Sequence, residues 1–515
     1  MAEAGTGSGP GLSKAYAGYA LFLLALINVL NYVDRNVIFA LFEPIKNELG
    51  LTDTELGWLG SAYVIVYSLA AVPLGVLADL KSRRAVIATG VTLWSVFTAL
   101  GGLSRNFWQL FFCRSMVGVG EASYSPAAQS LIADYFPGRG RAFALAVFWS
   151  GVALGGVAGI WVGGELEHLY GWRAAFLAVG IPGFLLAMVA SQLKDPNRPR
   201  IRRSIMEHVR RFELTTWRML KTTWPTWTGG VVGGAVAYLI DRTTPATSDV
   251  DVAVFSIIAA IGLSVNLALW VAHAIRHRHE EQRPGRRSAR VEDFLEAARI
   301  VLRTPTLVWL FLGGALIAFA MNGLVGWSPS YMQRELWLSP QLAGRTIGVW
   351  GLLAGILGTI FGGRLADQVG ERWLGGRVLV GAGGFLLGAP CAVWLLTVND
   401  LNLFIPLFFL TIFFFTWYHG PMSAAIFDVV PPQVGASVIG AYLFFTHIAG
   451  DAIALPFVGF LSDRIGLRLA MMTLPTVAFI GGAVVLLALR TVRRDYERAR
   501  RATGEWEIPP AAVAE

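Results

Sequence analysis

The sequence predicts an all-α polytopic membrane protein. Of its 515 residues, 55% are hydrophobic and only 15% are charged, whereas about a quarter of the residues in a typical soluble domain are charged. The mean hydropathy is +0.56. A soluble surface of this size would need many more charged side chains, so most of the apolar residues are expected to face lipid. At about 20 residues per span, the chain has room for a dozen or more membrane helices.

The apolar stretches form two groups of six with a pair between them. The N-terminal six lie at about 16–40, 56–78, 85–103, 107–134, 141–163 and 173–193. The C-terminal six lie at about 306–332, 342–366, 375–398, 402–427, 434–461 and 469–490. Two further runs, at about 226–240 and 252–274, predict a hydrophobic hairpin between the groups. We therefore expect fourteen spans: two six-helix halves and an extra two-helix hairpin.

Polar and basic segments divide the chain into domains. The expected boundaries are 1–15 for a disordered N-terminus, 16–193 for the N-terminal bundle, 194–225 for a basic cytoplasmic linker, 226–275 for the transmembrane hairpin, 276–305 for a second basic linker, 306–490 for the C-terminal bundle and 491–515 for a cytoplasmic tail. The first apolar run is not followed by a signal-peptidase-like site, so we expect it to be retained as a span.

The position of the basic residues decides what the net charge of +8 means. Lys and Arg are concentrated in the segments that flank the spans, which favours a membrane protein without a nucleic-acid partner. If the N-terminus is cytoplasmic, 32 of the 42 Lys and Arg residues lie on the cytoplasmic side and eight on the other. We therefore expect a multi-pass protein of the inner (plasma) membrane with both termini in the cytoplasm.

Four charged residues lie inside the predicted spans: Asp34, Arg35, Arg114 and Glu121. A charge at the centre of a spanning helix costs about 2.5 to 3.5 kcal/mol on insertion scales, so these side chains are expected to face an aqueous cavity or one another. Arg114 and Glu121 are seven residues apart, which returns them to nearly the same helix face. The alternative is a structural ion-pair network that only fixes the bundle.

Asp34 and Glu121 are the candidate proton-coupling residues, with Asp34 ranked as the proton carrier. Burial favours the neutral form of a carboxylic acid, whereas a nearby guanidinium favours the carboxylate, so movement of Arg35 or Arg114 would trigger proton uptake. Either arginine could instead hold the phosphate or carboxylate of an anionic amphiphile. Pairing with the two acids alone is the alternative for both.

Aromatic and ionisable residues of other spans complete the candidate site. His447 and Asp451 are four residues apart in the eleventh span and share a helix face, so either could be a second proton site. For His419 and His447 the alternative is a packed, hydrogen-bonded histidine. The other candidates for substrate binding or charge pairing are Tyr32, Tyr124, Trp417, Tyr418 and Tyr442. No metal site is expected, because the two cysteines lie in different halves and no metal-ligand spacing occurs.

A sequence element repeats at matching places in the two halves. Gly75-Val-Leu-Ala-Asp79-Leu-Lys-Ser-Arg83-Arg84 follows the second span, and Gly363-Arg-Leu-Ala-Asp367 opens a similar stretch after the eighth. Duplicated six-span halves joined by a basic linker are typical of transporters with alternating access, whose site lies near the midplane. The repeat therefore favours transport over enzymatic activity.

This element resembles the cytoplasmic loop motif of the major facilitator superfamily, which serves gating. The resemblance implies that Gly75, Asp79, Arg83, Arg84 and, in the second copy, Asp367 lock helices together in one state. The first copy has Ser82 where the family usually has glycine.

Four stretches are similar to the spinster family within that superfamily. They are Asn31-Tyr-Val-Asp-Arg35, the R-x6-E-A-x-Y-x-P run from Arg114 to Pro126, Trp327-Ser-Pro-Ser-Tyr331, and Gly450-Asp-Ala452 with Gly459-Phe-Leu-Ser-Asp463-Arg464. Spinster proteins of animals are linked to export of sphingosine-1-phosphate and lysophospholipids, and the bacterial relatives resemble proton-coupled transporters. The family pattern has twelve spans, so the hairpin departs from it.

Together these features predict a proton-coupled secondary active transporter that works by alternating access. The expected substrate is a lipid-like or amphipathic organic anion, such as a lysophospholipid or sphingolipid-type molecule; the alternative is a small organic anion or drug. We expect no enzyme, because HExxH, GxSxG and CxxC motifs are absent from the sequence, and no cofactor other than the proton gradient. Membrane lipids and the substrate are the expected partners of a monomeric chain. A sensor that inherited the fold is the remaining class.

Overall fold

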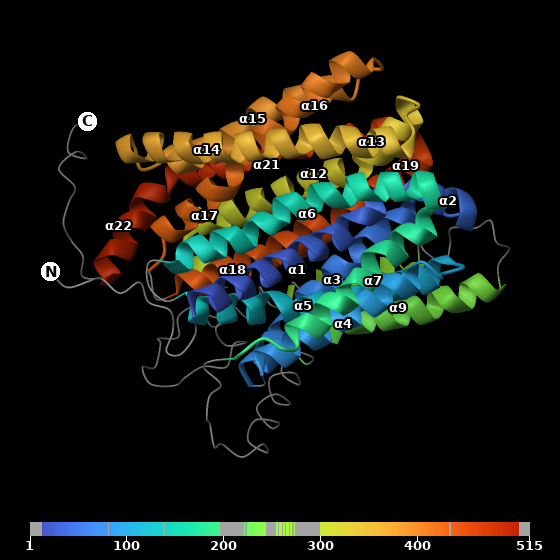
Figure 1. Ribbon diagram of the computed structural model, residues 1–515. Coiled ribbons are helices and arrows are strands. Elements are labelled where there is room, and N and C mark those ends of the chain that lie inside the picture. The colour runs from blue at the N-terminus through green and yellow to red at the C-terminus, as the bar shows by residue number, and fades with distance from the viewer. Residues whose placement is uncertain are drawn as a thin grey trace.

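The computed structural model describes residues 13–80, 82–136, 140–195, 224–243, 299–431 and 434–503, with Lys221 and a broken series of helical positions between 254 and 272. All regular elements in these ranges are helices. Figure 1 shows the long helices running side by side, with α1 (Lys14–Ala40) beginning on the side of the bundle where the last described helix, α22 (Val492–Thr503), lies. We call this side the terminal end, and the opposite side, where α2 lies, the α2 end.

Each half contains six long helical segments. Those of the N-terminal half are α1 (Lys14–Ala40), α3 (Asp53–Leu80), α4 (Arg83–Gly101), α5 (Phe107–Tyr135), α6 (Gly140–Tyr170) and α7 (Trp172–Ala190), with the short α2 (Phe42–Leu49) after α1. Those of the C-terminal half are α12 (Pro305–Glu335), α13 (Pro340–Thr346) with η1 (Ile347–Gly351) and α14 (Leu352–Arg372), α15 (Gly376–Leu395), α16 (Leu401–Phe415) with η2 (Thr416–Tyr418) and α17 (His419–Asp428), α18 (Gly435–Thr446) with η3 (His447–Asp451) and α19 (Ala452–Ile465), and α20 (Leu467–Met471) with α21 (Thr473–Leu487). After α21 come η4 (Ala488–Arg490) and α22 (Val492–Thr503).

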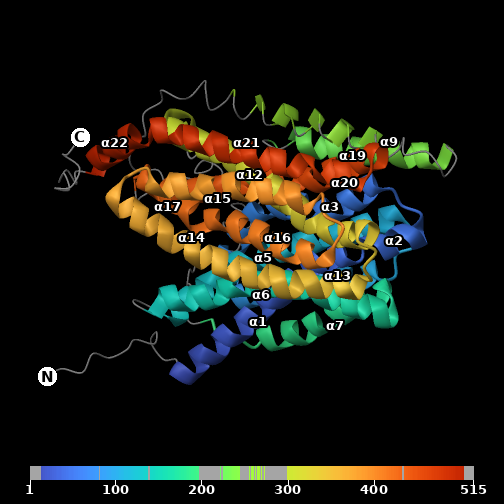
Figure 2. The same ribbon diagram turned by 90° about the horizontal axis from the view of Figure 1, so that it is seen from above.

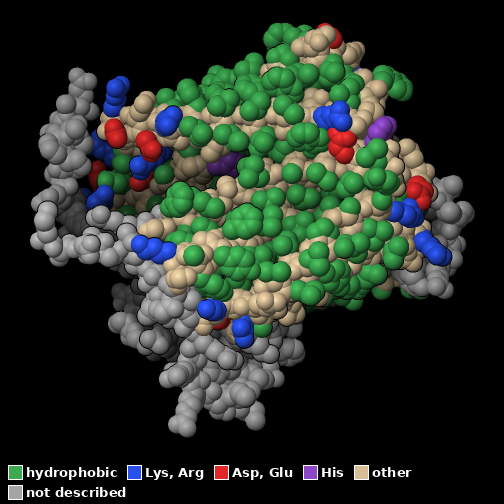
Figure 3. Space-filling view, in the orientation of Figure 1, with side chains coloured by type: hydrophobic (Ala, Val, Ile, Leu, Met, Phe, Trp, Pro, Cys, Tyr) green, Lys and Arg blue, Asp and Glu red, His purple; other side chains and the backbone are tan. Residues whose placement is uncertain are grey.

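Within the described residues, ten of these segments are long and apolar enough to cross a membrane. Figure 3 shows a wide band of hydrophobic side chains around the middle of the molecule, with charged side chains towards its two ends. This distribution is that of a multi-pass membrane protein, whose apolar band faces the hydrocarbon. In the sequence between the halves, α9 (Trp224–Thr243) covers the first apolar run of the expected hairpin. The hairpin and the total of fourteen spans stay predictions.

Local sequence signals explain how several of these helices begin. The side chains of Ser13, Asn106 and Ser339 accept hydrogen bonds from backbone N–H groups in the first turns of α1, α5 and α13, as N-cap residues do. The internal repeat is visible in the backbone: Gly171, between α6 and α7, has φ +80°, and Gly466, between α19 and α20, has φ +83°. Both turns join the last two helices of a half, and their left-handed conformation favours glycine.

The two halves pack closely at the α2 end. Here α3 lies against α19, and α6 lies against α13. A Cβ atom on Gly57 of α3 would overlap the Leu455 carbonyl, and one on Gly459 of α19 would overlap the carbonyl of Asp53. Glycine at these positions therefore allows a backbone-to-backbone approach between the halves.

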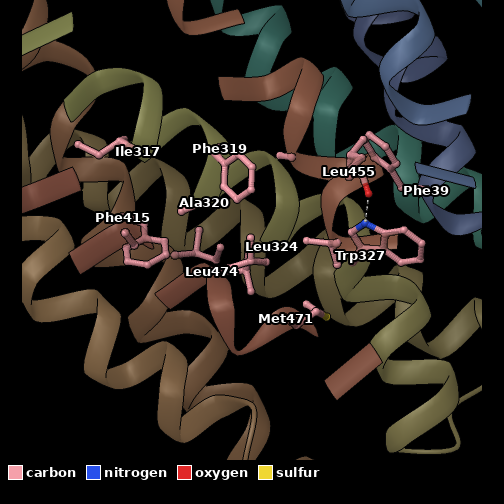
Figure 4. Packing of buried hydrophobic residues seen from close by; sticks show 14 of the residues in the cluster. Phe39, Ile317, Phe319, Ala320, Leu324, Trp327, Phe415, Leu455, Met471 and Leu474 are labelled. Carbon is pink, nitrogen blue, oxygen red and sulfur yellow. Dashed lines mark hydrogen bonds between the residues drawn. The ribbon is translucent and has the colours of Figure 1, made fainter. Parts of the chain in front are cut away.

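An apolar layer seals the halves just inside this end. Figure 4 shows Phe39 of α1 and Trp327 of α12 on either side of Leu455 of α19, with the Trp327 indole N–H donating to the Leu455 carbonyl at 3.2 Å. The Phe42 ring packs on Trp327, with ring centroids 5.2 Å apart. At the terminal end, by contrast, Figure 3 shows the molecule hollowed between the halves, with charged side chains around the hollow.

We predict that Gly459→Ala destabilises the protein although alanine is the better helix former. Overpacking a close contact costs about 1–3 kcal/mol, and the added methyl group would overlap the Asp53 carbonyl. Thermal unfolding of the purified protein measures the effect. Gly355→Ala on α14 is the matched control, because a Cβ there meets nothing within 4 Å, and it should be neutral or stabilising by up to about 1 kcal/mol. Equal unfolding temperatures for the two variants would contradict this account of the contact between α3 and α19.

Candidate functional site

Close packing of α1 on α6 places the charged residues of α1. Four glycines at every fourth position of α6 lie against α1: Gly151, Gly155, Gly159 and Gly163. A Cβ at Gly155 or Gly159 would overlap the carbonyl of Val29 or Val33. This close packing fixes the position of Asp34 and Arg35, which follow Val33 directly on α1.

The four charged residues predicted inside the spans form one cluster between α1 and α5, which we call the central charged cluster (Asp34, Arg35, Arg114 and Glu121). The Arg35 guanidinium donates from Nε to Oε2 of Glu121 at 2.6 Å. The Arg114 guanidinium donates from Nη1 to Oδ1 of Asp34 at 3.3 Å. Each arginine is thus paired with an acid on the other helix, and Arg114 and Glu121, which share a face of α5, have different partners.

The Arg114–Asp34 pair, which we call the inner pair, is held by further hydrogen bonds. Arg114 also donates to the main-chain carbonyls of Asp34, at 3.3 Å, and of Arg35, at 3.4 Å, and the Thr98 hydroxyl on α4 donates to Oδ2 of Asp34. Asp34, Arg114 and Glu121 are each only 1% exposed. A buried charge is tolerated only when it is paired and hydrogen-bonded, so removing either partner should be strongly destabilising.

The Arg35–Glu121 pair, which we call the outer pair, is less completely hydrogen-bonded. The side chain of Arg35 is 11% exposed, whereas that of Glu121 is fully buried. Oε1 of Glu121 and Nε of Arg114 have no hydrogen-bond partner among the described residues. One carboxylate oxygen of the cluster is therefore free to take up a proton or a hydrogen bond from another group.

Tyrosine rings surround the Arg35 guanidinium. Its Cζ atom lies 4.7 Å from the ring centroids of Tyr32 and Tyr67, and 5.5 Å from that of Tyr63. Tyr63 is shared with Arg114, whose Cζ atom is 5.4 Å from the ring centroid. Contacts of this kind stabilise a cation by about 0.5–2 kcal/mol without neutralising it. These three rings, which we call the tyrosine collar (Tyr32, Tyr63 and Tyr67), therefore keep Arg35 in place while leaving its charge available to a second anion.

The C-terminal half contributes an acid and a histidine at the π-helical turn η3. Nδ1 of His447 and Oδ2 of Asp451 are 2.6 Å apart, and the main-chain carbonyl of Asp451 accepts a hydrogen bond of 2.9 Å from Asn322 of α12. The turn η3 packs against α3, the helix of the N-terminal half that carries Tyr63 and Tyr67.

The remaining predicted site residues lie in several places. The rings of Tyr418 and His419 are tilted by 34° with their centroids 4.1 Å apart, and Tyr442 packs on Phe311. Trp417 fits against Gly362 and Gly384, between α14 and α15, which is a helix-packing position. The Tyr124 hydroxyl donates to the Leu24 carbonyl, inside the core of the N-terminal half. Of the aromatic candidates, the structure brings Tyr32 into contact with the central charged cluster and packs Trp417 and Tyr124 elsewhere.

A second ionic cluster joins the halves at the α2 end. We call it the closing cluster: Glu43, Lys46, Asp53, Arg334 and Asp463. The Arg334 guanidinium donates to both carboxylate oxygens of Asp53, at 2.6 and 2.7 Å, and to Glu43 at 2.8 Å. Lys46 lies 2.5 Å from Asp53, and Asp463 accepts from the backbone N–H groups of Asp53 and Thr54 at 2.9 and 2.8 Å. Arg334 and Asp463 belong to the C-terminal half, so the cluster holds the halves together.

The loop motif acts within the N-terminal half in this structure. Arg83 binds Asp134 at 2.6 Å and Asp195 at 2.5 Å, which ties the start of α4 to the ends of α5 and α7. Arg84 is exposed and donates to the carbonyl of Leu193 at 3.4 Å. Asp367, in the second copy, is exposed near the end of α14. The surroundings of Gly75 and the side chain of Asp79 lie outside what the structure describes.

Several residues of these clusters were not expected from the sequence. Thr98, Tyr63 and Tyr67 contact the central cluster from α4 and α3, and Asp53 and Arg334 form the heart of the closing cluster. The spacing of Tyr63 and Tyr67, four residues apart in an apolar span, is a signal for one helix face. In the sequence, Arg334 and Lys46 are counted only among the basic residues of the connections between spans, and nothing in the count marks them as members of a cluster.

Two pseudo-repeated six-helix halves, closed at one end and carrying buried ion pairs near the middle, define a membrane transporter of the alternating-access class. The chain belongs to the Major Facilitator Superfamily, whose family model matches residues 24–251 and 228–450. Within the superfamily it is of the spinster type, as its sequence stretches indicate.

Several similar proteins match nearly the whole chain. An MFS-type efflux pump of Mycolicibacterium smegmatis is 28% identical over 95% of this chain and 96% of its own length. The mouse sphingosine-1-phosphate transporter SPNS2 is 24% identical over 95% of this chain and 80% of its own. Among solved structures, a bacterial homologue of the human lysosomal transporter Spinster, in an inward-facing and unoccupied conformation, superposes with a TM-score of 0.69 at 22% identity, covering 94% of this chain and 99% of that one.

We predict that Arg334→Gln loosens the α2 end. The change removes the bidentate bond to Asp53 and the bond to Glu43, and losing about 1 to 1.4 kcal/mol should raise the population open at this end by roughly fivefold to tenfold. Labelling of a cysteine introduced at Phe39, behind the cluster, with a membrane-impermeant maleimide in a background without Cys113 and Cys391 measures this population.

Arg173→Gln is the matched control for this experiment. Arg173 is also at the α2 end and also pairs with a carboxylate, but its partner is Glu48 of the same half. Its loss should leave the labelling rate unchanged. Equal acceleration by both variants would show that general loosening, rather than the closing cluster, controls access.

Proposed function

We propose that this protein is a proton-coupled secondary active transporter of the plasma membrane, with both termini in the cytoplasm and fourteen spans in a monomeric chain. On this proposal the terminal end is cytoplasmic, and the conformation described is closed to the outside and open to the inside. The closing cluster and the apolar layer at the α2 end support this, as does the hollow at the terminal end in Figure 3. The excess of Lys and Arg on the terminal side supports the orientation.

The observation that carries the proposal is the pairing of two acids with two arginines across α1 and α5. Arg35 in a poorly hydrated site needs a negative partner in every state of the cycle, because an unpaired buried charge is strongly unfavourable. Glu121 is that partner in this conformation. When a proton neutralises Glu121, Arg35 is released to an anion that enters the cavity, and when the anion leaves, Glu121 gives up the proton and pairs again.

Asp34 and Arg114 act as the second switch in this scheme. Their pair is more completely hydrogen-bonded, through Thr98 and two main-chain carbonyls of α1. Protonation of Asp34 would weaken the tie between α1 and α5 and let the two helices shift during rocking. Glu121 is then coupled to substrate, and Asp34 to the conformational change. No cofactor is needed beyond the proton gradient.

The proposed substrate is a lipid-like or amphipathic organic anion of the lysophospholipid or sphingolipid kind. A guanidinium surrounded by three tyrosine rings suits the phosphate or carboxylate of a head group. Tyr418 of the C-terminal half, which is partly exposed, offers aromatic surface for a chain. The similarity to a mouse sphingosine-1-phosphate transporter supports this class.

The second candidate substrate is a small organic anion or drug. It is favoured by the match to an MFS-type efflux pump over almost the full length of both chains. Both candidate substrates require Arg35 to bind their anionic group. Only the lipid-like candidate also requires an apolar chain. A flux assay with head-group and chain variants of one substrate separates them.

We predict that Glu121→Gln and Asp34→Asn each abolish proton-driven accumulation in proteoliposomes. Both changes keep the shape of the side chain but remove the group that exchanges a proton. Substrate counterflow, which needs no net proton movement, should survive in at least Glu121→Gln. Glu497→Gln on α22 is the control, because Glu497 pairs with Arg493 on an exposed helix face, away from the central charged cluster. Wild-type coupling in both variants would disprove the scheme.

We also predict that Arg35→Gln removes the preference for anionic over neutral amphiphiles. Loss of a charge-assisted hydrogen bond to a head group should lower affinity by about 1.5–3 kcal/mol for an anionic lysophospholipid, while a neutral monoacylglycerol should bind as before. Scintillation proximity binding of the two ligands measures the difference. If affinity for both falls equally, Arg35 has a structural role only.

A further inference from the structure

A cavity of about 490 Å³ lies on the outer side of the interface between the halves. Its inner wall is formed by α3, α5, η3 and α19, and its outer wall by α9 and helical positions between 254 and 272. Figure 2 shows α9 at the edge of the bundle on the side where α19 and α3 lie. The cavity therefore exists because the hairpin, which the twelve-span pattern lacks, covers the seam between α3 and α19.

The described part of the hairpin is closely packed within itself. A Cβ on Gly229 of α9 would lie 2.9 Å from the carbonyl oxygen of Ile258, and one on Gly262 would lie 3.0 Å from Cα of Gly229. Small residues at such contacts let two helices approach closely in a membrane. The outer wall is therefore a helix pair with its own interface.

An aromatic group anchors this wall to the N-terminal half. Phe255 is only 6% exposed, and its ring centroid lies 5.2 Å from that of Trp58, 5.6 Å from that of Phe111 and 5.8 Å from that of Trp108. These bulky rings fix the hairpin near the α2 end of the cavity. Beyond them, a Cβ on Gly230 of α9 meets nothing within 4 Å, so the wall is held away from the seam.

The lining has the chemistry of a hydrocarbon site. Among the described lining residues no side chain is charged, and the polar members are the hydroxyl residues Thr54, Ser115, Thr226 and Ser264. The remaining lining includes apolar side chains that are themselves exposed to the surroundings of the protein, namely Val231 at 68%, Ile453 and Phe460 at 42%, and Phe457 at 40%. An apolar cavity that opens among exposed apolar side chains of a membrane protein excludes water and admits hydrocarbon.

We propose that this cavity binds one alkyl chain of a bilayer lipid, from the leaflet at the α2 end. Along α3 the lining runs from Thr54 to Leu69, which is about 22 Å at 1.5 Å per residue. This length exceeds half of a hydrocarbon core of about 30 Å, so a chain of one leaflet fits inside. The volume falls within the range of about 300–1,000 Å³ that is usual for small-molecule sites.

The proposed lipid site is separate from the transport site. The residues of α3 that line it, such as Ala62 and Val66, each precede a tyrosine of the collar around Arg35, Tyr63 and Tyr67. Successive residues of a helix point about 100° apart, so the cavity and the collar occupy different faces of α3. The bound chain contacts α3 and α19 together and therefore bridges the two halves along their seam.

Photo-crosslinking tests this proposal. The full-length protein is reconstituted in phosphatidylglycerol vesicles doped with a phospholipid that carries a diazirine in one acyl chain, irradiated, and mapped by peptide mass spectrometry. We expect adducts to be enriched on cavity residues of α3, α19 and α9 over the lipid-facing surfaces of α15 and α16. Gly230→Phe, which fills the cavity, should lower the cavity adducts by roughly tenfold.

Gly234→Phe, one turn further along α9, is the matched control. A Cβ there also meets nothing within 4 Å, but Gly234 does not line the cavity, so the adduct pattern should stay that of the wild type. Ala259→Phe fills the cavity from the opposite helix of the hairpin and guards against a folding defect in Gly230→Phe. Adducts spread evenly over all lipid-facing helices in the wild type, or cavity adducts that persist in both filling variants, would overturn the proposal.

A third result would also overturn it. If an excess of soluble lysophospholipid displaces the cavity adducts in proportion to its transport, the cavity is part of the substrate path and not a site for bilayer lipid. Because the wild-type adduct map needs no transport activity, the proposal can fail while the proposed transport function holds, and the reverse.

Discussion

Every charge placed inside the hydrocarbon region must keep a partner, and this constraint organises the structure. In the N-terminal half, two arginines and two acids are buried between α1 and α5, and each guanidinium is bonded to a carboxylate on the other helix. Replacing such pairs with apolar residues often improves stability, so their presence indicates a function that needs charge. The same constraint links proton binding to substrate binding, since a neutralised acid leaves an arginine that must find another anion.

Glycine makes this arrangement possible. The four glycines of α6 allow α1 to approach until side chains of Asp34 and Arg35 reach α5. Gly57 and Gly459 do the same for α3 and α19 at the interface between the halves. Without a hydrophobic drive for association inside lipid, close backbone contact supplies much of the packing energy. The residues with the smallest side chains thus determine where the charged ones lie.

The sequence alone was sufficient for the helical membrane fold with its two halves and for the members of the central charged cluster. Apolar stretches and their grouping predict the two six-helix halves because hydrocarbon imposes a fixed span length, and the scarcity of charge makes Asp34, Arg35, Arg114 and Glu121 conspicuous. The partners could not be predicted, because helical spacing places Arg114 and Glu121 on one face but does not show which residues of α1 lie opposite. Trp417 was proposed for the same reason as Tyr32, yet its place against two glycines depends on helix contacts that one sequence does not reveal. The closing cluster escaped notice because its members lie at the ends of spans, where charge is ordinary.

The two ionic clusters differ in depth, and this difference suits a cycle between two states. Arg334 and Lys46 of the closing cluster have side chains that are 23% and 30% exposed, so water can solvate them when the halves separate. Exposed ion pairs contribute only about 0–1 kcal/mol each. Inverting a two-state population from 1:99 to 99:1 requires a difference of about 5.5 kcal/mol, which is of the order that a few such pairs and a small apolar layer can hold. The central cluster, by contrast, cannot open to solvent without exchanging partners, because three of its four members are almost fully buried. Water can replace the weak ion pairs of the closing cluster, whereas only a proton or an anion can rearrange the central charged cluster. The opening of the α2 end therefore depends on whether a proton or an anion is bound at the central charged cluster.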